Sequence, residues 1–439
     1  MKFLESLFRL AENQTSIRRE FVAGLTSFAA MAYILAVNPA ILSAAGMDQA
    51  ALVTVTALGA AIGCFLMAGL ANYPIAMAPG MGMNAFFAFT VCQGMGVPWQ
   101  GGLGIVFWNG ILFLALSTSG FREKLVACVP SGLRLGVQAG IGLFIAFVGL
   151  RNAGLIVDNP ATLVGLGSMQ SLPGWLALAG IALTGVLVAR KMPGGILVAI
   201  LLTAIVGLFV PSGEGMVTEF PAKIISLPSS LVGTSFALDL SYPFVHFREA
   251  WPLIFAFLFV DLFDSLGTLL GVSRTAGLLD SSGKLPRLNR ALLADAAATV
   301  SGAVLGTSPV TSYVESAAGV KAGGRTGLTA VVVGCCFLLA LFLWPLILAL
   351  PDLATGAALV VIGLTMVEGM RHLGFDDIAE FLPAILTMLA MPLAYSISDG
   401  IALGFMIYVC LMVGTGKARE VNFLTYIVAG LFALRYLIL

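Results

Sequence analysis

Apolar stretches of transmembrane length recur along almost the whole chain, from residue 20 to the C-terminus, with short polar connections between them. A helix needs about 17 to 25 apolar residues to cross the roughly 30 Å hydrocarbon core of a bilayer. The pattern predicts about fourteen transmembrane segments, at 21–45, 49–71, 75–93, 99–119, 131–150, 173–190, 193–211, 249–272, 288–306, 308–321, 326–350, 354–370, 378–396 and 398–415. A further apolar segment, 421–439, is expected either to span the membrane or to lie at its interface.

The composition agrees with this pattern. Hydrophobic residues make up 59% of the chain and charged residues 10%. A soluble domain has about 25% charged residues, so a soluble globule is excluded. We predict an all-α polytopic membrane protein. Acidic and basic residues balance at 22 each, and we expect no nucleic-acid partner.

The positions of lysine and arginine predict the orientation, because cytoplasmic loops collect positive charge. With a cytoplasmic N-terminus, 18 of the 22 positive residues fall on the inside, among them Arg122, Lys124 and Lys284. Three fall outside, and one lies in the unassigned C-terminal segment. We therefore expect a protein of the plasma (inner) membrane with a cytoplasmic, uncleaved N-terminal segment, 1–20.

The two halves of the chain share landmarks at a nearly constant offset. Gly101-Gly102 recurs as Gly323-Gly324, and Ile141-Gly142-Leu143 recurs as Ile362-Gly363-Leu364, which are shifts of 222 and 221 residues. Internal repeats of this kind are typical of secondary transporters. Seven spans per repeat is an odd number, so the second repeat is expected to be inverted relative to the first. Inverted repeats favour alternating access to a central binding site.

One span in each predicted repeat is rich in residues that break helices. These are the third span, 75–93, and the tenth, 308–321, which we call the broken segments. Proline removes a backbone donor and glycine permits unusual dihedral angles, so each segment is expected to begin as an extended strand and continue as a half-helix. Asn84 and Glu315 occupy nearly matching positions in them. The symmetry predicts a binding site between the two segments.

Glu315 is a carboxylate in a stretch of small and hydroxylated residues within an apolar chain. An ionised side chain at the centre of a bilayer costs about 2.5 to 3.5 kcal/mol on insertion scales, so such a residue is a functional candidate. The alternative is a buried structural carboxylate. Asn84 is a second candidate, and its alternative role is to satisfy exposed backbone in its broken segment.

Three aspartates in the eighth and ninth spans are further candidates. Asp261 and Asp264 share one helical face at i and i+3, and Thr268 continues that face one turn beyond Asp264. Each aspartate could line the binding site or an ion path, or could cap or pair structurally, and Asp264 is the first choice. Asp295 is equally consistent with an ion pathway and with a hydrogen bond between packed helices.

Other patterns exclude several chemistries. The six cysteines lie in or beside apolar spans without CxxC spacing, the two histidines are isolated, and the chain contains no GxxxxGK phosphate loop. We expect no metal, no cofactor and no enzymatic activity.

The glycine-rich stretches 59–63 and 136–140 are expected to be close helix-packing surfaces. Phe86, Phe87 and Phe89 could stack on a flat ligand or pack in the core.

The acidic residues also restrict the ligand. A binding carboxylate without a matching buried lysine or arginine argues against a simple anion. It suits a neutral ligand with N–H donors, because carboxylates accept such hydrogen bonds in bidentate fashion. It equally suits a coupling cation, because removal of water favours the neutral, protonated form of a carboxyl.

Several long motifs resemble one family. The strings 26–39, 72–87, 259–268, 306–327 and 395–402 are similar to those of the AzgA-like adenine/guanine/hypoxanthine permeases, within the wider xanthine/uracil permeases of the nucleobase:cation symporter 2 family. The resemblance spans nearly the whole chain. It implies fourteen spans in two inverted repeats of seven.

The resemblance also implies a domain organisation. A core domain would comprise 21–125 and 248–350, and a gate domain would comprise 126–247 and 351–439 with the C-terminal segment. Homodimers would form through gate helices within the lipid bilayer.

The functional roles implied by the resemblance fall on residues already singled out. Asp264 and Glu315 would bind a purine nucleobase with Asn84 nearby, and protons rather than sodium would be the coupling ion. Thr268, Val314 and Ser316 are expected to complete the substrate site. The ion-coupling candidates are Asp261, Asp264 and Asp295.

The resulting hypothesis is proton-coupled uptake of adenine, guanine or hypoxanthine by an elevator-like movement of the core against the gate. The alternatives are a xanthine/uracil-type nucleobase symporter and an anion transporter or channel of the same fold. The anion alternative predicts a basic residue at the membrane midplane, which the acidic spans disfavour. A membrane sensor would require an attached soluble domain, which the sequence pattern does not indicate.

Overall fold

The computed structural model describes residues 2–119, 129–213, 215–280 and 285–438. Within these ranges, nine helices are long and apolar enough to cross a membrane. Shorter apolar helices accompany them at Gly195–Gly207, Ile378–Leu393 and Phe423–Leu434. The expected polytopic, mostly helical architecture is therefore confirmed. The residues Arg122, Lys124, Cys128 and Lys284, and the expected domain boundary at 125–126, lie outside the described residues.

The described residues up to the end of α9 contain eight helices, two π-helical turns and three short strands. They are α1 (Lys2–Phe8), α2 (Ile17–Met31), α3 (Ile34–Ser43), α4 (Gln49–Leu66), η1 (Met67–Ala71), β1 (Met77–Pro79), α5 (Met81–Ala85), η2 (Phe86–Gly94), α6 (Trp99–Ser119), α8 (Ser131–Asn152), β2 (Ile156–Asn159), β3 (Leu163–Leu166) and α9 (Leu172–Ala189).

The remaining elements begin with α10 (Gly195–Gly207) and the small hairpin β4 (Pro211–Ser212) and β5 (Gly215–Met216). They continue as α11 (Tyr242–Val245), α12 (Phe247–Ala276), α13 (Leu288–Leu305), β6 (Val310–Ser312), α14 (Ser316–Lys321), α15 (Gly327–Ala340), η3 (Leu341–Leu343), α16 (Trp344–Leu348), α17 (Asp352–Met366), η4 (Val367–His372), α18 (Ile378–Leu393), α19 (Ile397–Gly414), η5 (Ala418–Glu420) and α20 (Phe423–Ile438). The helix ends agree with the expected segments to within a few residues.

The two broken segments meet at the centre of the fold. β1 pairs with β6 in antiparallel register, with Met77 opposite Ser312 and Pro79 opposite Val310. α5 follows β1 directly, and α14 begins four residues after β6. The expectation of an extended strand followed by a half-helix is therefore confirmed in both segments. The pairing satisfies the backbone donors and acceptors that the strands would otherwise leave unpaired.

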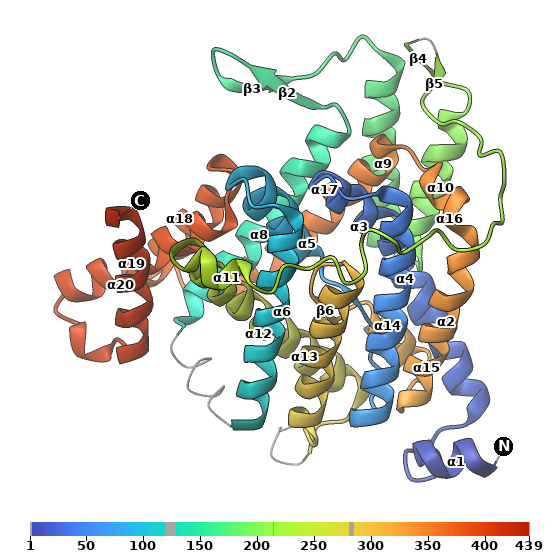
Figure 1. Cartoon of the computed structure of the whole chain (residues 1–439), viewed down its shortest axis with the longest axis horizontal. Helices are drawn as coiled ribbons and strands as arrows, with labels where there is room; N and C mark the ends of the chain where they lie inside the picture. The colour runs from blue at the N-terminus through green and yellow to red at the C-terminus, as the bar shows by residue number, and fades with distance from the viewer. Residues whose placement is uncertain (1, 120–128, 214, 281–284, 439) are drawn as a thin grey trace.

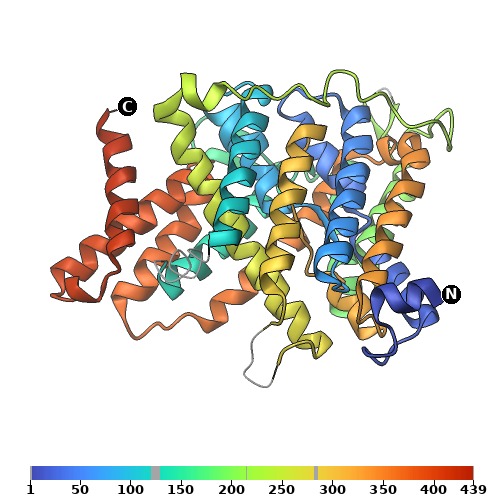
Figure 2. The ribbon, with the colours of Figure 1, turned by 60° about the horizontal axis from the view of Figure 1, so that its bottom comes forward.

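The helices form one body with its termini at opposite edges. In both overall views α1 lies at one edge, and α19 and α20 lie at the other (Figures 1 and 2). α6, α12 and α13 lie between them (Figure 1). The connection from β5 to α11 crosses one face of this body (Figure 2), where its backbone donates to carbonyls at the ends of other helices, such as Phe236 N–H to Val304 at 2.8 Å.

Glycines allow the closest helix contacts, as the sequence pattern predicts. A Cβ added at Gly63 would lie 2.9 Å from the Cβ of Met77, and one at Gly136 would lie 2.6 Å from the Cα of Ala384. The crossing of α8 and α17 is equally tight, because a Cβ at Gly149 would lie 2.7 Å from the carbonyl oxygen of Gly356. Van der Waals packing of this kind is a main source of helix association in a bilayer.

The first span begins with a buried acidic residue. α2 begins at Ile17, four residues before the expected start of the span, and Glu20 is fully buried within it. The carboxylate of Glu20 accepts backbone hydrogen bonds from Arg325 at 2.9 Å and Thr329 at 3.2 Å. An anionic group is favourable at the positive end of a helix, so Glu20 stabilises the start of α15.

Candidate functional site

Glu315 lies at the start of α14, three residues after the strand of its broken segment ends. Its side chain is half-buried. The hydroxyl of Tyr33 donates a 2.5 Å hydrogen bond to its Oε1. Tyr33 is buried at the junction of α2 and α3, so the first span holds the carboxylate in position.

Asp264 lies on the same side of the fold as Glu315. α12, which carries Asp264, packs against both β6 and α14. The Asp264 and Glu315 carboxyls are near enough to act on each other electrostatically. Asp264 is exposed, Thr268 is buried one turn further along α12, and Val314 beside Glu315 is 61% exposed. Accessible carboxylates therefore come together from α12 and the second broken segment.

Asn84 belongs to a buried amide and hydroxyl network. Its Nδ2 donates a 2.9 Å hydrogen bond to Oδ1 of Asn38, while its own Oδ1 has no partner among the described residues. Asn38 in turn donates to the hydroxyl of Thr56 at 2.8 Å and to that of Thr307 at 3.2 Å. The network connects α5 to α3, α4 and the residues before β6. It orients Asn84 and leaves one amide oxygen free.

Asp295 is buried and its carboxylate oxygens are occupied by protein donors. The hydroxyl of Ser265 donates to Oδ2, and that of Ser312 donates to Oδ1 at 3.2 Å. These contacts join α13 to α12 and to β6. Of the two roles considered from the sequence, this geometry favours the hydrogen bond between packed elements.

Asp261 is also fully buried, on the face of α12 toward α6 and α13. Its Oδ2 accepts hydrogen bonds of 3.3 Å from Asn109 Nδ2 of α6 and from Thr299 Oγ1 of α13. Its Oδ1 has no partner among the described residues. The two aspartates of α12 therefore occupy different environments, with Asp264 accessible and Asp261 enclosed.

The remaining polar groups tie the two broken segments together. Ser316 is fully buried, and its Oγ accepts a 2.9 Å hydrogen bond from the backbone N–H of Ala76. The hydroxyl of Tyr313 donates to the carbonyl oxygen of Pro79 at 2.6 Å. The side chain of Ser316 therefore stabilises the fold. Ser316 was expected to bind the substrate, and this contact leaves only its backbone for that role.

The aromatic run of the first broken segment packs inside the protein. Phe86 and Phe87 are fully buried, and the ring of Phe86 lies 4.5 Å from that of Phe257. Phe89 is also buried and contacts Phe144 and Tyr395. This arrangement favours core packing over stacking on a ligand.

Sequence reasoning missed Tyr33, Asn38, Asn109 and Tyr313. Each is a polar side chain inside an apolar stretch, and Asn38 also precedes a proline. A polar residue in an apolar stretch can be singled out from the sequence as a candidate. The sequence does not show which distant side chains it contacts. Among the described residues, no group of three or more histidine, cysteine, aspartate or glutamate side chains is arranged to hold a metal ion.

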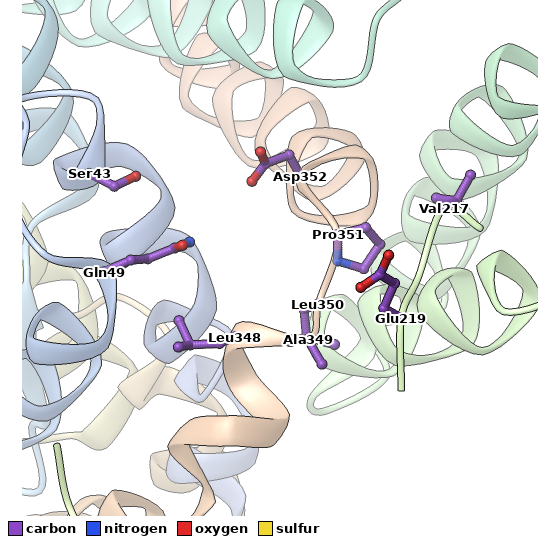
Figure 3. A pocket seen from close by; sticks show the side chains of 9 residues that line it. All are labelled: Ser43, Gln49, Val217, Glu219, Leu348, Ala349, Leu350, Pro351 and Asp352. Carbon is purple, nitrogen blue, oxygen red and sulfur yellow. The ribbon is translucent and has the colours of Figure 1, made fainter. Parts of the chain in front are cut away.

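A cavity of about 320 Å³ lies at a different place from these residues. Figure 3 shows Ser43 and Gln49 on one side of it and Val217 and Glu219 on the other, with residues 348–352 between them. It contains two exposed carboxylates, Glu219 and Asp352, and none of the predicted site residues. We therefore take the carboxylate cluster of α12 and the broken segments as the candidate site.

Comparison with known proteins gives a family and close curated relatives. A model of the Permease family, Xan_ur_permease, matches residues 18–403. The adenine permease AdeP of Escherichia coli (strain K12) is 43% identical over 434 residues, 98% of this chain and 95% of AdeP. The guanine/hypoxanthine permease PbuG of Bacillus subtilis (strain 168) is 45% identical over 445 residues, 99% of this chain and 100% of PbuG.

Solved structures share the fold at low sequence identity. The transmembrane domain of the cyanobacterial bicarbonate transporter BicA superposes with a TM-score of 0.64 at 16% identity, covering 88% of this chain and 96% of that domain. The murine anion transporter Slc26a9 in its inward-facing state gives a TM-score of 0.65 at 13% identity, covering 94% of this chain and 72% of that chain. At these identities the likeness establishes the fold alone.

Proposed function

Since the chain belongs to the xanthine/uracil permease family and is a membrane permease rather than an enzyme, we propose that it imports purine nucleobases. The relatives that match it over nearly their whole length are permeases for adenine and for guanine and hypoxanthine. These relatives support a purine base, and they support adenine, guanine and hypoxanthine as the first bases to test.

The observation that carries the proposal is the pair of accessible carboxylates, Glu315 and Asp264. Neither has a lysine or arginine partner among the described residues, whose ion pairs lie elsewhere in the chain. Carboxylate oxygens accept hydrogen bonds, so the pair suits the ring N–H and exocyclic N–H groups of a purine. The free Oδ1 of Asn84 offers one further acceptor. Thr268, Val314 and the backbone of Ser316 complete the proposed site.

Transport would use the fourteen-span, inverted-repeat layout expected from the sequence. The antiparallel pairing of β1 with β6 supports it, because the two strands occupy corresponding positions in the two repeats. The contact of Gly142 with Gly363 also supports the inverted-repeat layout. These two glycines are related by the repeat offset, and they meet where α8 crosses α17. The core would comprise 21–125 and 248–350, and it would move against a gate of 126–247 and 351–439 in an elevator-like step.

The coupling ion and the assembly are further parts of the proposal. Protons would drive uptake, with Asp261, Asp264 and Asp295 as the candidate carriers. The protein would lie in the plasma membrane with its N-terminus in the cytoplasm, as the distribution of positive residues supports. A homodimer would form through gate helices.

A second candidate is an anion transporter, because the fold is shared with bicarbonate and other anion transporters. An anion would have to bind beside two carboxylates without a described basic partner, which is electrostatically unfavourable. The geometry therefore favours the nucleobase. A uracil or xanthine carrier of the same family is the remaining alternative.

The test is uptake of labelled hypoxanthine, competed by adenine, guanine, xanthine, uracil and bicarbonate, at two pH values with and without sodium. We expect competition by purines and faster uptake at the lower external pH. Competition by uracil alone or bicarbonate alone would contradict the purine assignment. Loss of uptake on sodium removal at both pH values would contradict proton coupling.

A further inference from the structure

Asp261 and Asn109 form a buried pair in which one oxygen of each side chain lacks a partner. Both residues are fully buried. Asn109 Nδ2 lies 3.3 Å from Asp261 Oδ2, while Asp261 Oδ1 and Asn109 Oδ1 have no hydrogen bond to any described residue. Each of these two contacting side chains therefore has one buried acceptor oxygen without a hydrogen bond to a described residue. A buried acceptor without a hydrogen bond is unfavourable, so a donor is expected between the two side chains.

One added proton would give both oxygens a hydrogen-bond partner. In a carboxylic acid paired with a primary amide, the amide N–H donates to one carboxyl oxygen and the acid O–H donates to the amide oxygen. The first of these bonds is present between Asn109 and Asp261. A proton on Asp261 Oδ1 would complete the second. A sodium ion suits the pair less well, because hard cations require about six oxygen ligands and only two oxygens are free.

The charged groups near Asp261 are both acidic, Asp264 of its own helix and Asp295 of α13. α6 contributes the uncharged Asn109, and Thr299 of α13 contributes a hydroxyl. Both oxygens of Asp295 already accept hydrogen bonds, from Ser265 and Ser312, whereas Oδ1 of Asp261 accepts none from a described residue. Of the two buried aspartates, Asp261 is the one placed to gain and lose a proton.

We propose that Asp261 and Asn109 form a proton-binding site, separate from the nucleobase site, and that this site carries the coupled proton. The inference rests on the proposed function and deepens it. The proton binds Asp261 Oδ1 from water and returns to water when the carboxyl ionises. No other bond is made or broken.

Thr299 gives this site a connection to the second broken segment. Its hydroxyl lies 3.3 Å from Asp261 Oδ2 and 3.2 Å from the carbonyl oxygen of Val310, the first residue of β6. The hydroxyl has one hydrogen, so it can donate to only one of them at a time. An ionised Asp261 attracts it, and a neutral Asp261 releases it to Val310. Protonation is thereby linked to the strand that leads to Glu315.

The experiment compares Asp261→Asn with the wild type and with Asp352→Asn in proteoliposomes. Asparagine is a neutral analogue of the protonated carboxyl. Asp261→Asn is expected to exchange hypoxanthine across the membrane but to lose accumulation driven by an inward proton gradient. Asp352→Asn, which removes an exposed carboxylate outside the cluster, is expected to accumulate hypoxanthine as the wild type does. Wild-type accumulation and pH dependence in Asp261→Asn would overturn the inference.

A second variant keeps the inference testable if Asp261→Asn does not fold. Thr299→Val removes a donor to the ionised carboxyl while conserving side-chain shape, so the protonated form persists to higher pH. The pH of half-maximal uptake is expected to rise by about one unit. An unchanged pH profile in Thr299→Val would contradict the site. Failure of the nucleobase proposal would be recognised separately, by unchanged hypoxanthine binding in Glu315→Gln.

Discussion

At the scale of single residues, side chains far apart in the sequence hold the carboxylates in position. Glu315 is an ionisable residue in an apolar span, which is costly without such contacts. Its partner Tyr33 lies 282 residues away in the chain, and no local pattern relates the two. The same holds for Asp261 and Asn109, which are 152 residues apart. Long-range contacts decided which aspartate is enclosed and which is accessible.

The contact between Tyr33 and Glu315 leads to a residue-scale prediction. Tyr33→Phe removes one hydrogen bond that orients the carboxylate, which is worth about 0.5 to 1.5 kcal/mol for a typical intramolecular bond. Hypoxanthine binding is expected to weaken by roughly twofold to tenfold, measured by isothermal titration of the purified protein. Tyr426→Phe is the matched control, because its hydroxyl donates to Ala418 near the end of the chain. Equal affinities in all three proteins would count against the positioning role of Tyr33.

At the scale of elements, the helix-breaking residues predicted the broken segments correctly. Proline and glycine are local signals, and both strands appear where those residues occur. The pairing of β1 with β6 followed only from the proposed symmetry, because neither strand of three residues could be stable alone. The role of Ser316 could not be predicted from neighbouring residues in the sequence. It was expected beside the substrate, and its hydroxyl instead accepts the backbone N–H of Ala76.

The crossing of α8 and α17 gives a prediction about stability. A methyl group at Gly142 would contact Met366 Cβ at 2.7 Å as well as the carbonyl oxygen of Gly363. Gly142→Ala is therefore expected to destabilise the protein by about 1 to 3 kcal/mol, as overpacking does in other cores. Thermal unfolding in detergent measures this as a lower melting temperature.

Gly185 in α9 provides the control for this substitution, because a methyl group there meets nothing within 4 Å. Gly185→Ala is expected to leave the melting temperature unchanged or to raise it slightly, since alanine is the better helix former. Equal melting temperatures for the two variants would show that the crossing is not tightly packed.

The ends of α18 and α19 are joined by an exposed ion pair outside the membrane-spanning segments. Lys417 Nζ donates to Asp377 Oδ2 at 2.8 Å, and this hydrogen bond lowers the pKa of the Asp377 carboxyl below its usual value. A lowered folded-state pKa contributes stability above the unfolded value of about 3.9, and that contribution is lost as the pH falls through the lowered pKa.

Lys417→Met is accordingly expected to have a slightly lower melting temperature than the wild type at about pH 7, and the difference is expected to shrink as the pH falls below about 3.9. The effect is small because exposed ion pairs are screened by solvent. Lys223→Met, at an exposed lysine in the connection between β5 and α11, controls for loss of a positive charge. A gap that persists unchanged at the lower pH would show that the pair does not cause it.

At the scale of the whole molecule, the apolar pattern predicted a polytopic membrane protein, and family membership agrees. The proposed movement of core against gate depends on contacts that sequence could not reveal. Thr90 Oγ1 of η2 accepts a 3.2 Å hydrogen bond from the backbone of Ile397, and Phe89 contacts Tyr395. These contacts join the proposed core to the proposed gate, so an elevator-like step would have to break them.

The proposed function depends on Glu315 holding a purine nucleobase. Equilibrium binding of hypoxanthine to purified wild-type protein and to Glu315→Gln measures this, with size-exclusion chromatography and thermal unfolding to verify that the variant is folded. Loss of a hydrogen bond to a charged group costs about 1.5 to 3 kcal/mol, so the variant is expected to bind roughly tenfold to hundredfold more weakly. A folded Glu315→Gln protein with wild-type affinity for hypoxanthine would show that Glu315 does not hold the base.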